Sequence, residues 1–200
     1  MLAGATQFNH SPLGRVHCVA RTDYTMSRDD DQDAFALTVF LGERAPIHRL
    51  ANSLTGAVVL ELGSGICAIP VTSSVCQAIG VNSHSPGDTP QWPFRTIDAR
   101  SAERCAALAG GGRLAYLETW GYRDEGQELG VAWLDGVICV GLVDVPWYSG
   151  RGGSIDQIGL FLGAPLQDVF RRRLLQVATH SEQFIAAARQ GNHPFRGTTP

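Results

Sequence analysis

The residues most suggestive of chemistry form a glycine-rich turn after an apolar run. Residues 57–62 are apolar apart from one glutamate, and Gly63, Ser64 and Gly65 follow directly. Glycines in such a turn let a cofactor approach the backbone, provided that a following helix points its N-terminus at the ligand. They can equally supply the positive φ angles of a hairpin turn. The residues that come next must therefore distinguish a cofactor site from a turn.

The run 58–65 resembles the first motif of class I S-adenosylmethionine methyltransferases. Further along the chain, the Asp-Val-Pro-Trp segment 144–147 resembles in part the [DNS]-P-P-[YFW] catalytic motif of their amino-methylating members. The resemblance implies a methyltransferase-like enzyme. In such an enzyme Gly63 and Gly65 would lie against the cofactor, and Asp144 would belong to the catalytic motif.

Three features of the sequence favour a hairpin instead. Residues 66–71 are β-prone, and Pro70 among them cannot donate the N–H that a helix interior requires. A ribose-binding acid is expected about 20 residues after such a turn, yet residues 81–84 contain none. Val145 also stands where the second motif has proline. We therefore expect a turn between two strands and no bound cofactor, with the methyltransferase reading kept as the alternative.

Other catalytic constellations are missing from the sequence. The six histidines show no metal-binding spacing, and there is no G-x-S-x-G nucleophile elbow. All sixteen basic residues are arginine, so no lysine can act as a Schiff base or general base. The sequence therefore favours a protein that is not an enzyme and holds no metal.

A polar segment between two predicted strands offers a contact surface. We predict strands at 113–120 and 128–134 and a loop over 119–128 that gathers aromatic and acidic side chains. Aromatic residues beside charges are typical of interface hot spots, and acidic clusters steer basic partners. Two further aromatics follow the next strand and are expected at the same edge. The predicted partner-binding residues are Trp120, Tyr122, Asp124, Glu125, Glu128, Trp147 and Tyr148.

From about residue 36 to residue 180 the chain resembles a group of small bacterial proteins of immunity (antitoxin) type. The resemblance rests on the Ala-Tyr-Leu-Glu segment 115–118, on Gln127 and on the Val-Ala-Trp segment 131–133. Residues 122–125 depart from the Gly-Gly-Val-Gly usual in that group. The resemblance implies a non-catalytic protein that binds and neutralises a cognate toxin or effector in the producing cell.

The predicted elements form an α+β domain. The sequence predicts a mostly antiparallel sheet, made of a strand at 34–41, a hairpin at 57–71 and a meander at 113–143, packed with helices on one face. The meander turns at Asp135-Gly136, a type I′ dipeptide. Thr72 is expected to cap a short helix that ends at Gly80, and Asp98 or Ser101 to cap the next. Further helices are expected at 43–53, 154–162, 166–177 and 181–190.

Composition sets the remaining expectations. Residues 1–33 have no periodicity and end in an acidic run, so we predict a disordered leader, a single domain over 34–190 and a frayed tail over 191–200. A net charge of −3 does not favour electrostatic binding to nucleic acid or to a membrane surface, and no apolar run is long enough to span a bilayer. The five cysteines form no C-x-x-C pair, which favours a reducing compartment and hence the cytoplasm.

Overall fold

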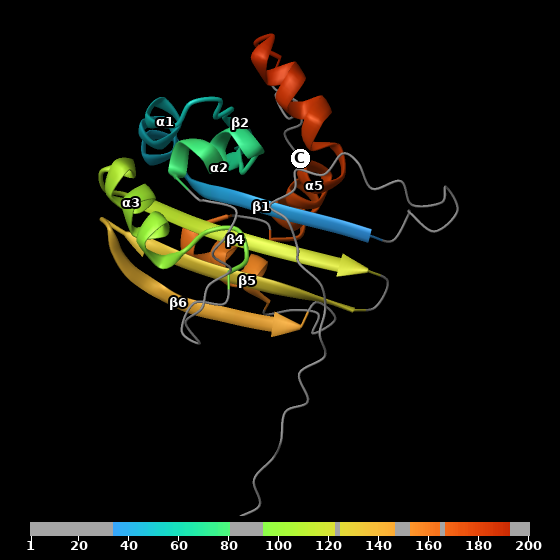
Figure 1. Ribbon diagram of the computed structural model, residues 1–200. Helices are drawn as coiled ribbons and strands as arrows, with labels where there is room; N and C mark the ends of the chain where they lie inside the picture. Colours follow the sequence, from blue (N-terminus) through green and yellow to red (C-terminus); the bar gives the residue numbers. More distant parts are fainter. Residues whose placement is uncertain (1–33, 81–93, 123–124, 147–152, 165–166, 193–200) are drawn as a thin grey trace, which may run out of the picture.

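The computed structural model describes residues 34–80, 94–122, 125–146, 153–164 and 167–192. The predicted leader and most of the predicted tail lie outside these ranges. Six strands form one sheet in the order β2-β3-β1-β4-β5-β6, with every pairing antiparallel (Figure 1). The strands are β1 (Ala34–Glu43), β2 (Leu60–Gly63), β3 (Ile66–Pro70), β4 (Arg113–Tyr122), β5 (Glu125–Leu134) and β6 (Val137–Pro146). The predicted α+β class and antiparallel sheet are confirmed.

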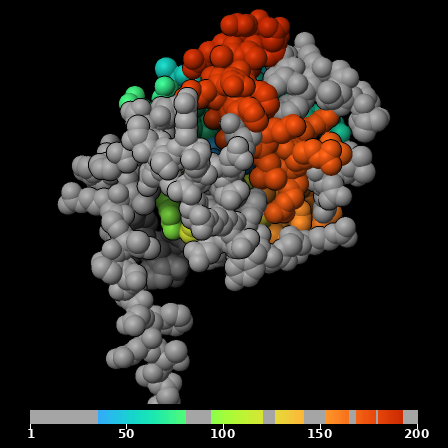
Figure 2. Space-filling view, turned by 90° about the vertical axis from the view of Figure 1, so that its right-hand side faces the viewer, coloured from blue at the N-terminus to red at the C-terminus, as the bar shows by residue number. Residues whose placement is uncertain are grey.

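Helices cover both faces of the sheet, rather than the one face that we predicted. One layer consists of α1 (Arg44–Ser53), α2 (Ser73–Ile79) and α3 (Ala99–Ala109). The opposite layer consists of α4 (Ser154–Leu162) and α5 (Gln167–Arg189). Figure 2 shows α5 at the outer surface of that layer. No helix in the described ranges combines the length and the apolar character needed to cross a bilayer.

The central strand β1 explains this double coverage. Successive side chains of a strand point to opposite faces. Phe40 packs with α1, α2 and α3, whereas its neighbours Val39 and Leu41 pack with α4 and α5. All three side chains are fully buried. A nearly continuous apolar run is the pattern of a strand buried on both sides, and here it requires two helical layers.

The predicted helix ends are confirmed by local geometry. The Thr72 side chain accepts a hydrogen bond from the Val75 amide at the start of α2, and Gly80 closes that helix in the left-handed conformation. The Asp98 carboxylate accepts from the Ser101 amide at 2.7 Å to cap α3. The predicted junction between the last two helices lies inside α5 as a kink at His180, where φ is −129° and ψ is 25°.

Candidate functional site

The glycine-rich turn joins two antiparallel strands, as predicted. Residues 66–70 form β3, and Leu60 pairs with Ala68 across the hairpin. Gly63, Ser64 and Gly65 have φ angles of 96°, 53° and 77°, all in the left-handed region. Glycine adopts such angles at little cost, so the two glycines that flank Ser64 allow the chain to turn sharply. No helix N-terminus follows the turn, so it lacks the feature that a methionine-cofactor site requires.

Gly63 makes room for an internal arginine. A Cβ at this position would collide with Nη1 of Arg173, which reaches across from α5. The same guanidinium nitrogen donates a hydrogen bond to the carbonyl oxygen of Leu62. The space beside the glycine is thus filled by the protein's own side chain.

The sheet order also separates the residues of the methyltransferase alternative. Gly63 and Gly65 lie at the β2–β3 end of the sheet, whereas Asp144 lies on β6, the strand at the other edge. With about 4.8 Å between neighbouring strands, the two positions are roughly 20 Å apart across the sheet. Gly63, Gly65 and Asp144 therefore cannot form one cofactor and catalytic site, and we do not propose it.

The predicted loop over 119–128 is wrong, because most of it is a hairpin. β4 continues to Tyr122 and β5 already begins at Glu125, and these two residues pair with each other. Pairing also joins Thr119 to Glu128 further down the ladder. The polar composition suggested a loop, but the two glutamates of the ladder, Glu118 and Glu128, accept hydrogen bonds from groups packed on the sheet, so the strands continue through them.

Glu118 anchors the segment that leads into α3. Its side chain is buried, and its carboxylate accepts hydrogen bonds from the backbone amides of Arg95 and Thr96, each at 2.8 Å. Tyr116 Oη donates a third hydrogen bond at 2.6 Å. Three donors around one buried carboxylate replace the water that it loses on folding. Glu118 therefore has a structural role.

Two aromatic residues complete this region. Burial, together with the neighbouring Glu118 carboxylate, raises the pKa of the Tyr116 phenol well above its ordinary value of 10.0. The phenol therefore remains a hydrogen-bond donor at all ordinary pH values. Trp120, a predicted partner-binding residue, is half-buried, and the guanidinium carbon of Arg95 lies 4.7 Å from its ring centroid. Such a stacked cation stabilises the ring where it is and leaves only part of it for a partner.

Glu128, another predicted partner-binding residue, is buried on the opposite face and is only 1% exposed. Its carboxylate accepts hydrogen bonds from the Ile155 amide at 3.1 Å and from Nη2 of Arg171 at 2.8 Å. Ser154 Oγ donates to the Glu128 carbonyl oxygen at 2.9 Å. These contacts fasten the start of α4 and the first turns of α5 to the sheet. The prediction that Glu128 contacts a partner is wrong.

The electrostatics of Glu128 reflect its burial. Desolvation raises the pKa of its carboxyl above the ordinary value of 4.5, and the Ile155 amide and the Arg171 guanidinium oppose that rise. Asp156, which lies 3.5 Å from Nη1 of the same arginine, adds to it. The carboxylate is thus held by contacts from α4 and α5.

The remaining predicted contact residues cluster at the far end of the hairpin or lie outside the described residues. Tyr122 and Glu125 end their strands there, although their side chains are not described. Asp124, Trp147 and Tyr148 lie outside the described ranges. Pro146, the last residue of β6, pairs with Gln127 and so brings the end of β6 alongside this end of the hairpin.

The other end of the meander carries a feature that the sequence analysis missed. Leu134, Val137 and Ile138 flank the Asp135-Gly136 turn and are 45%, 69% and 48% exposed. We call these three residues the edge patch. They were assigned to strands correctly, but their exposure follows from their position at the end of β5 and the start of the edge strand β6, which residue types do not reveal.

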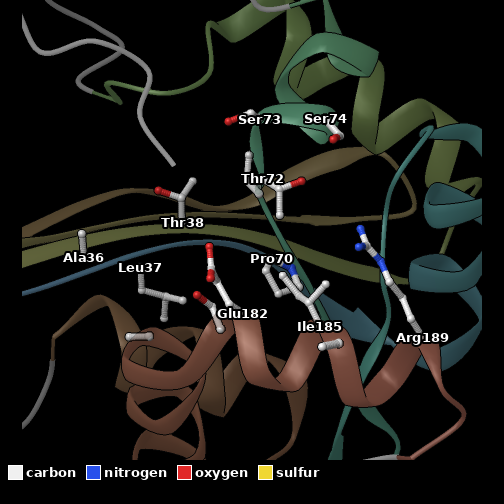
Figure 3. A pocket seen from close by; sticks show the side chains of 14 residues that line it. Ala36, Leu37, Thr38, Pro70, Thr72, Ser73, Ser74, Glu182, Ile185 and Arg189 are labelled. Carbon is white, nitrogen blue, oxygen red and sulfur yellow. The ribbon is translucent and has the colours of Figure 1, made fainter. Parts of the chain in front are cut away.

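A pocket of about 610 Å³ opens beside the first half of β1 (Figure 3). Ala36, Leu37 and Thr38 of β1 lie at its back. One wall is the start of α2, with Ser73 and Ser74, and the other is the last part of α5 (Figure 3). The α5 side chains include Glu182 and Arg189, neither of which any sequence pattern marked as functional.

Within the described ranges, no three His, Cys, Asp or Glu side chains group closely enough to hold a metal ion. Comparisons of the chain with protein-family models, with curated proteins and with solved structures found no match. The contacts and surfaces described above therefore carry the functional conclusion.

Proposed function

We propose that the chain is a non-catalytic bacterial protein of immunity type, which binds and neutralises a cognate toxin or effector protein in the cytoplasm. The observation that carries the proposal is the exposed edge patch at the turn between β5 and β6. Its three large apolar side chains flank one tight turn: Leu134 pairs with Val137 across it, and Ile138 follows on β6. Clustered apolar side chains at a surface mark protein contact sites.

The backbone of β6 adds to this surface. β6 has ten residues and pairs with β5 on one side, and no described strand pairs with it on the other. An edge strand presents alternate N–H and C=O groups that a second chain can extend. A partner that adds a strand here would gain main-chain hydrogen bonds and would cover the edge patch at the same time.

The far end of the same strand supplies charge. Glu125 is the first residue of β5, Asp124 precedes it in the sequence, and Gln127 pairs with Pro146 at the end of β6. Two carboxylates at one end of an apolar edge would orient a basic partner along it. The proposed contact residues are therefore the edge patch together with Trp120, Tyr122, Asp124, Glu125, Trp147 and Tyr148.

The buried carboxylates favour binding over catalysis. Glu118 and Glu128 are the two glutamates buried in the described sheet, and each is engaged by several protein donors. A general acid or base needs to reach a substrate proton in a cleft. Both groups instead fasten helices or loops to the sheet.

Co-expression in bacteria tests the proposal. Each protein encoded beside this one is expressed alone and together with it, and cell growth is measured. We expect one neighbour to be toxic alone and harmless when paired. The idea is abandoned if no neighbour is toxic, or if the chain protects against none of them.

Substitutions in the edge patch test the surface itself. Val137→Asp and Ile138→Asp should weaken the complex at least about tenfold, because a charge would be buried against the partner. Leu160→Asp is the matched control, since Leu160 is 67% exposed but lies on α4. Equal affinities for all three variants would place the interface elsewhere.

A further inference from the structure

The pocket beside β1 occupies the place of a missing strand. β3 pairs with β1 only as far as Pro70, which lies opposite Val39. The chain then turns away into α2, while residues 34–37 of β1 continue and pair with β4 alone among the described strands. One side of this part of β1 is therefore an open edge within the described chain. We call the pocket in front of it the β1 slot.

The backbone of β1 points its hydrogen-bonding groups into the slot. Thr38 accepts a hydrogen bond from the Val71 amide, and Arg44 donates one to Gly65, so even-numbered residues of β1 face the β3 side. In an antiparallel ladder the N–H and C=O of one residue point to the same side, and the next residue points the other way. The N–H and C=O of Ala36 therefore face the slot and not β4.

Opposite charges line the α5 wall of the slot. Glu182 and Arg189 both line the pocket, and Ile185 lies between them on the same wall (Figure 3). Neither charged residue forms an ion pair within the described chain. They are seven residues apart on one helix, which places them about 10 Å apart along its axis.

This spacing matches an extended peptide. A strand advances about 3.3 Å per residue, so three residues also span about 10 Å. We propose that the β1 slot binds a short extended peptide whose cationic and anionic groups lie about three residues apart. The cation pairs with Glu182 and the carboxylate pairs with Arg189. The peptide backbone pairs with Ala36, as in other complexes in which a strand is added to a sheet edge.

The lining fits such a ligand in detail. Leu37 and Ile185 offer apolar contacts to side chains that alternate along the peptide. Ser73 and Ser74 lie on the wall opposite α5 in Figure 3 and offer hydroxyl groups to polar atoms of the ligand. The slot is separate from the edge patch, because β6 forms an outer edge of the sheet and two strands, β4 and β5, lie between it and β1.

Three probes test the charge requirement by isothermal titration calorimetry on the full chain. Tri-L-alanine carries both terminal charges at the required spacing and should bind. N-acetyl-tri-L-alanine amide has the same backbone without charges, and L-alanine has the charges without the spacing. Both should bind at least about tenfold more weakly. Equal binding of the three probes, or no binding of tri-L-alanine at millimolar concentration, would overturn the proposal.

Variants then assign the contacts. Glu182→Gln and Arg189→Gln should each weaken tri-L-alanine binding at least about tenfold, whereas Arg172→Gln, an exposed arginine of α5 outside the pocket, should leave it unchanged. Circular dichroism confirms that each variant is folded. Ala36→Pro removes the slot-facing N–H without removing a hydrogen bond to β4, and it should also abolish binding. Binding that survives all of these changes contradicts the site.

A fourth peptide in the same titration distinguishes a free peptide ligand from the C-terminus of a longer chain. The acetylated peptide Gly-Arg-Ala-Ala with a free carboxylate carries its cation on a side chain. If it binds as well as tri-L-alanine, the slot accepts a protein C-terminus; if only tri-L-alanine binds, the ligand is a free tripeptide. Either result supports an extended peptide with paired charges.

Discussion

Glu118 and Glu128 lie on neighbouring strands, yet their carboxylates point to opposite faces of the sheet. Glu128 pairs with Thr119 in the β4–β5 ladder, and Glu118 is one residue earlier on β4. A shift of one residue reverses the face to which a side chain points. One carboxylate therefore fastens the Arg95–Thr96 segment on the α3 side, and the other fastens α4 and α5.

Tyr116→Phe should destabilise the fold through Glu118. The substitution removes one of three donors to a buried carboxylate and should lower the free energy of unfolding by about 1.5–3 kcal/mol. Urea denaturation measures the change. A double-mutant cycle with Glu118→Gln provides the control, because the cost of Tyr116→Phe should shrink in that background. The same cost in both backgrounds would show that the hydrogen bond contributes nothing.

Glu128→Gln should change how stability depends on pH. The pKa of Glu128 is raised above 4.5 in the folded protein, so the folded state binds this proton more tightly than the unfolded state. The contribution of Glu128 to the free energy of unfolding is therefore complete below the ordinary pKa of 4.5, and it is lost as the pH rises through the raised pKa of the folded state. Glutamine cannot ionise and should not show this loss.

Urea denaturation between about pH 4 and pH 8 measures the effect. The free energy of unfolding of the natural protein should fall relative to that of Glu128→Gln across this range. Glu128→Lys serves as a second variant, which should unfold the protein because it places a cation beside Arg171 in a buried site. Parallel pH curves for the natural protein and Glu128→Gln would contradict the raised pKa.

Gly63→Ala should be more harmful than Gly65→Ala. Both residues have positive φ angles, so both substitutions carry backbone strain of about 1–2 kcal/mol. Only at Gly63 would the new Cβ collide with Arg173, whereas nothing lies within 4 Å of one at Gly65. Thermal denaturation should show the larger loss for Gly63→Ala, and an equal loss for both would mean that Arg173 moves aside freely.

Charge reversal at the hairpin end should slow toxin binding without affecting the fold. Asp124→Lys and Glu125→Lys remove the attraction to a basic partner and should lower the association rate constant most at low salt. Stopped-flow fluorescence with the toxin identified by co-expression measures it. Glu103→Lys on α3 is the control, since Glu103 is exposed but lies on a different element. If all three variants slow binding equally, the effect comes from net charge and not from this end of the hairpin.

The sequence by itself determined the local structure. Two helix N-caps, Thr72 and Asp98, are set by hydrogen bonds to amides three residues ahead, and the structure has both as predicted. The turn at Asp135-Gly136 is set by the positive φ angles that these two residues allow. Pro70 and the β-prone residues beside it likewise identified a strand after the glycine turn. Such signals are readable because each depends on only a few adjacent residues.

Only the tertiary structure decided which carboxylates are buried and which surfaces are open. Glu128 looked like a loop residue, because the Arg171 guanidinium that accompanies its burial lies 43 residues away in the sequence. The edge patch depends on strand order, which places β6 at an edge of the sheet. The β1 slot exists because β3 ends at Pro70, opposite Val39, and leaves the first residues of β1 unpaired on that side within the described chain. Burial and edge position arise from contacts between distant segments, and the types of adjacent residues do not contain that information.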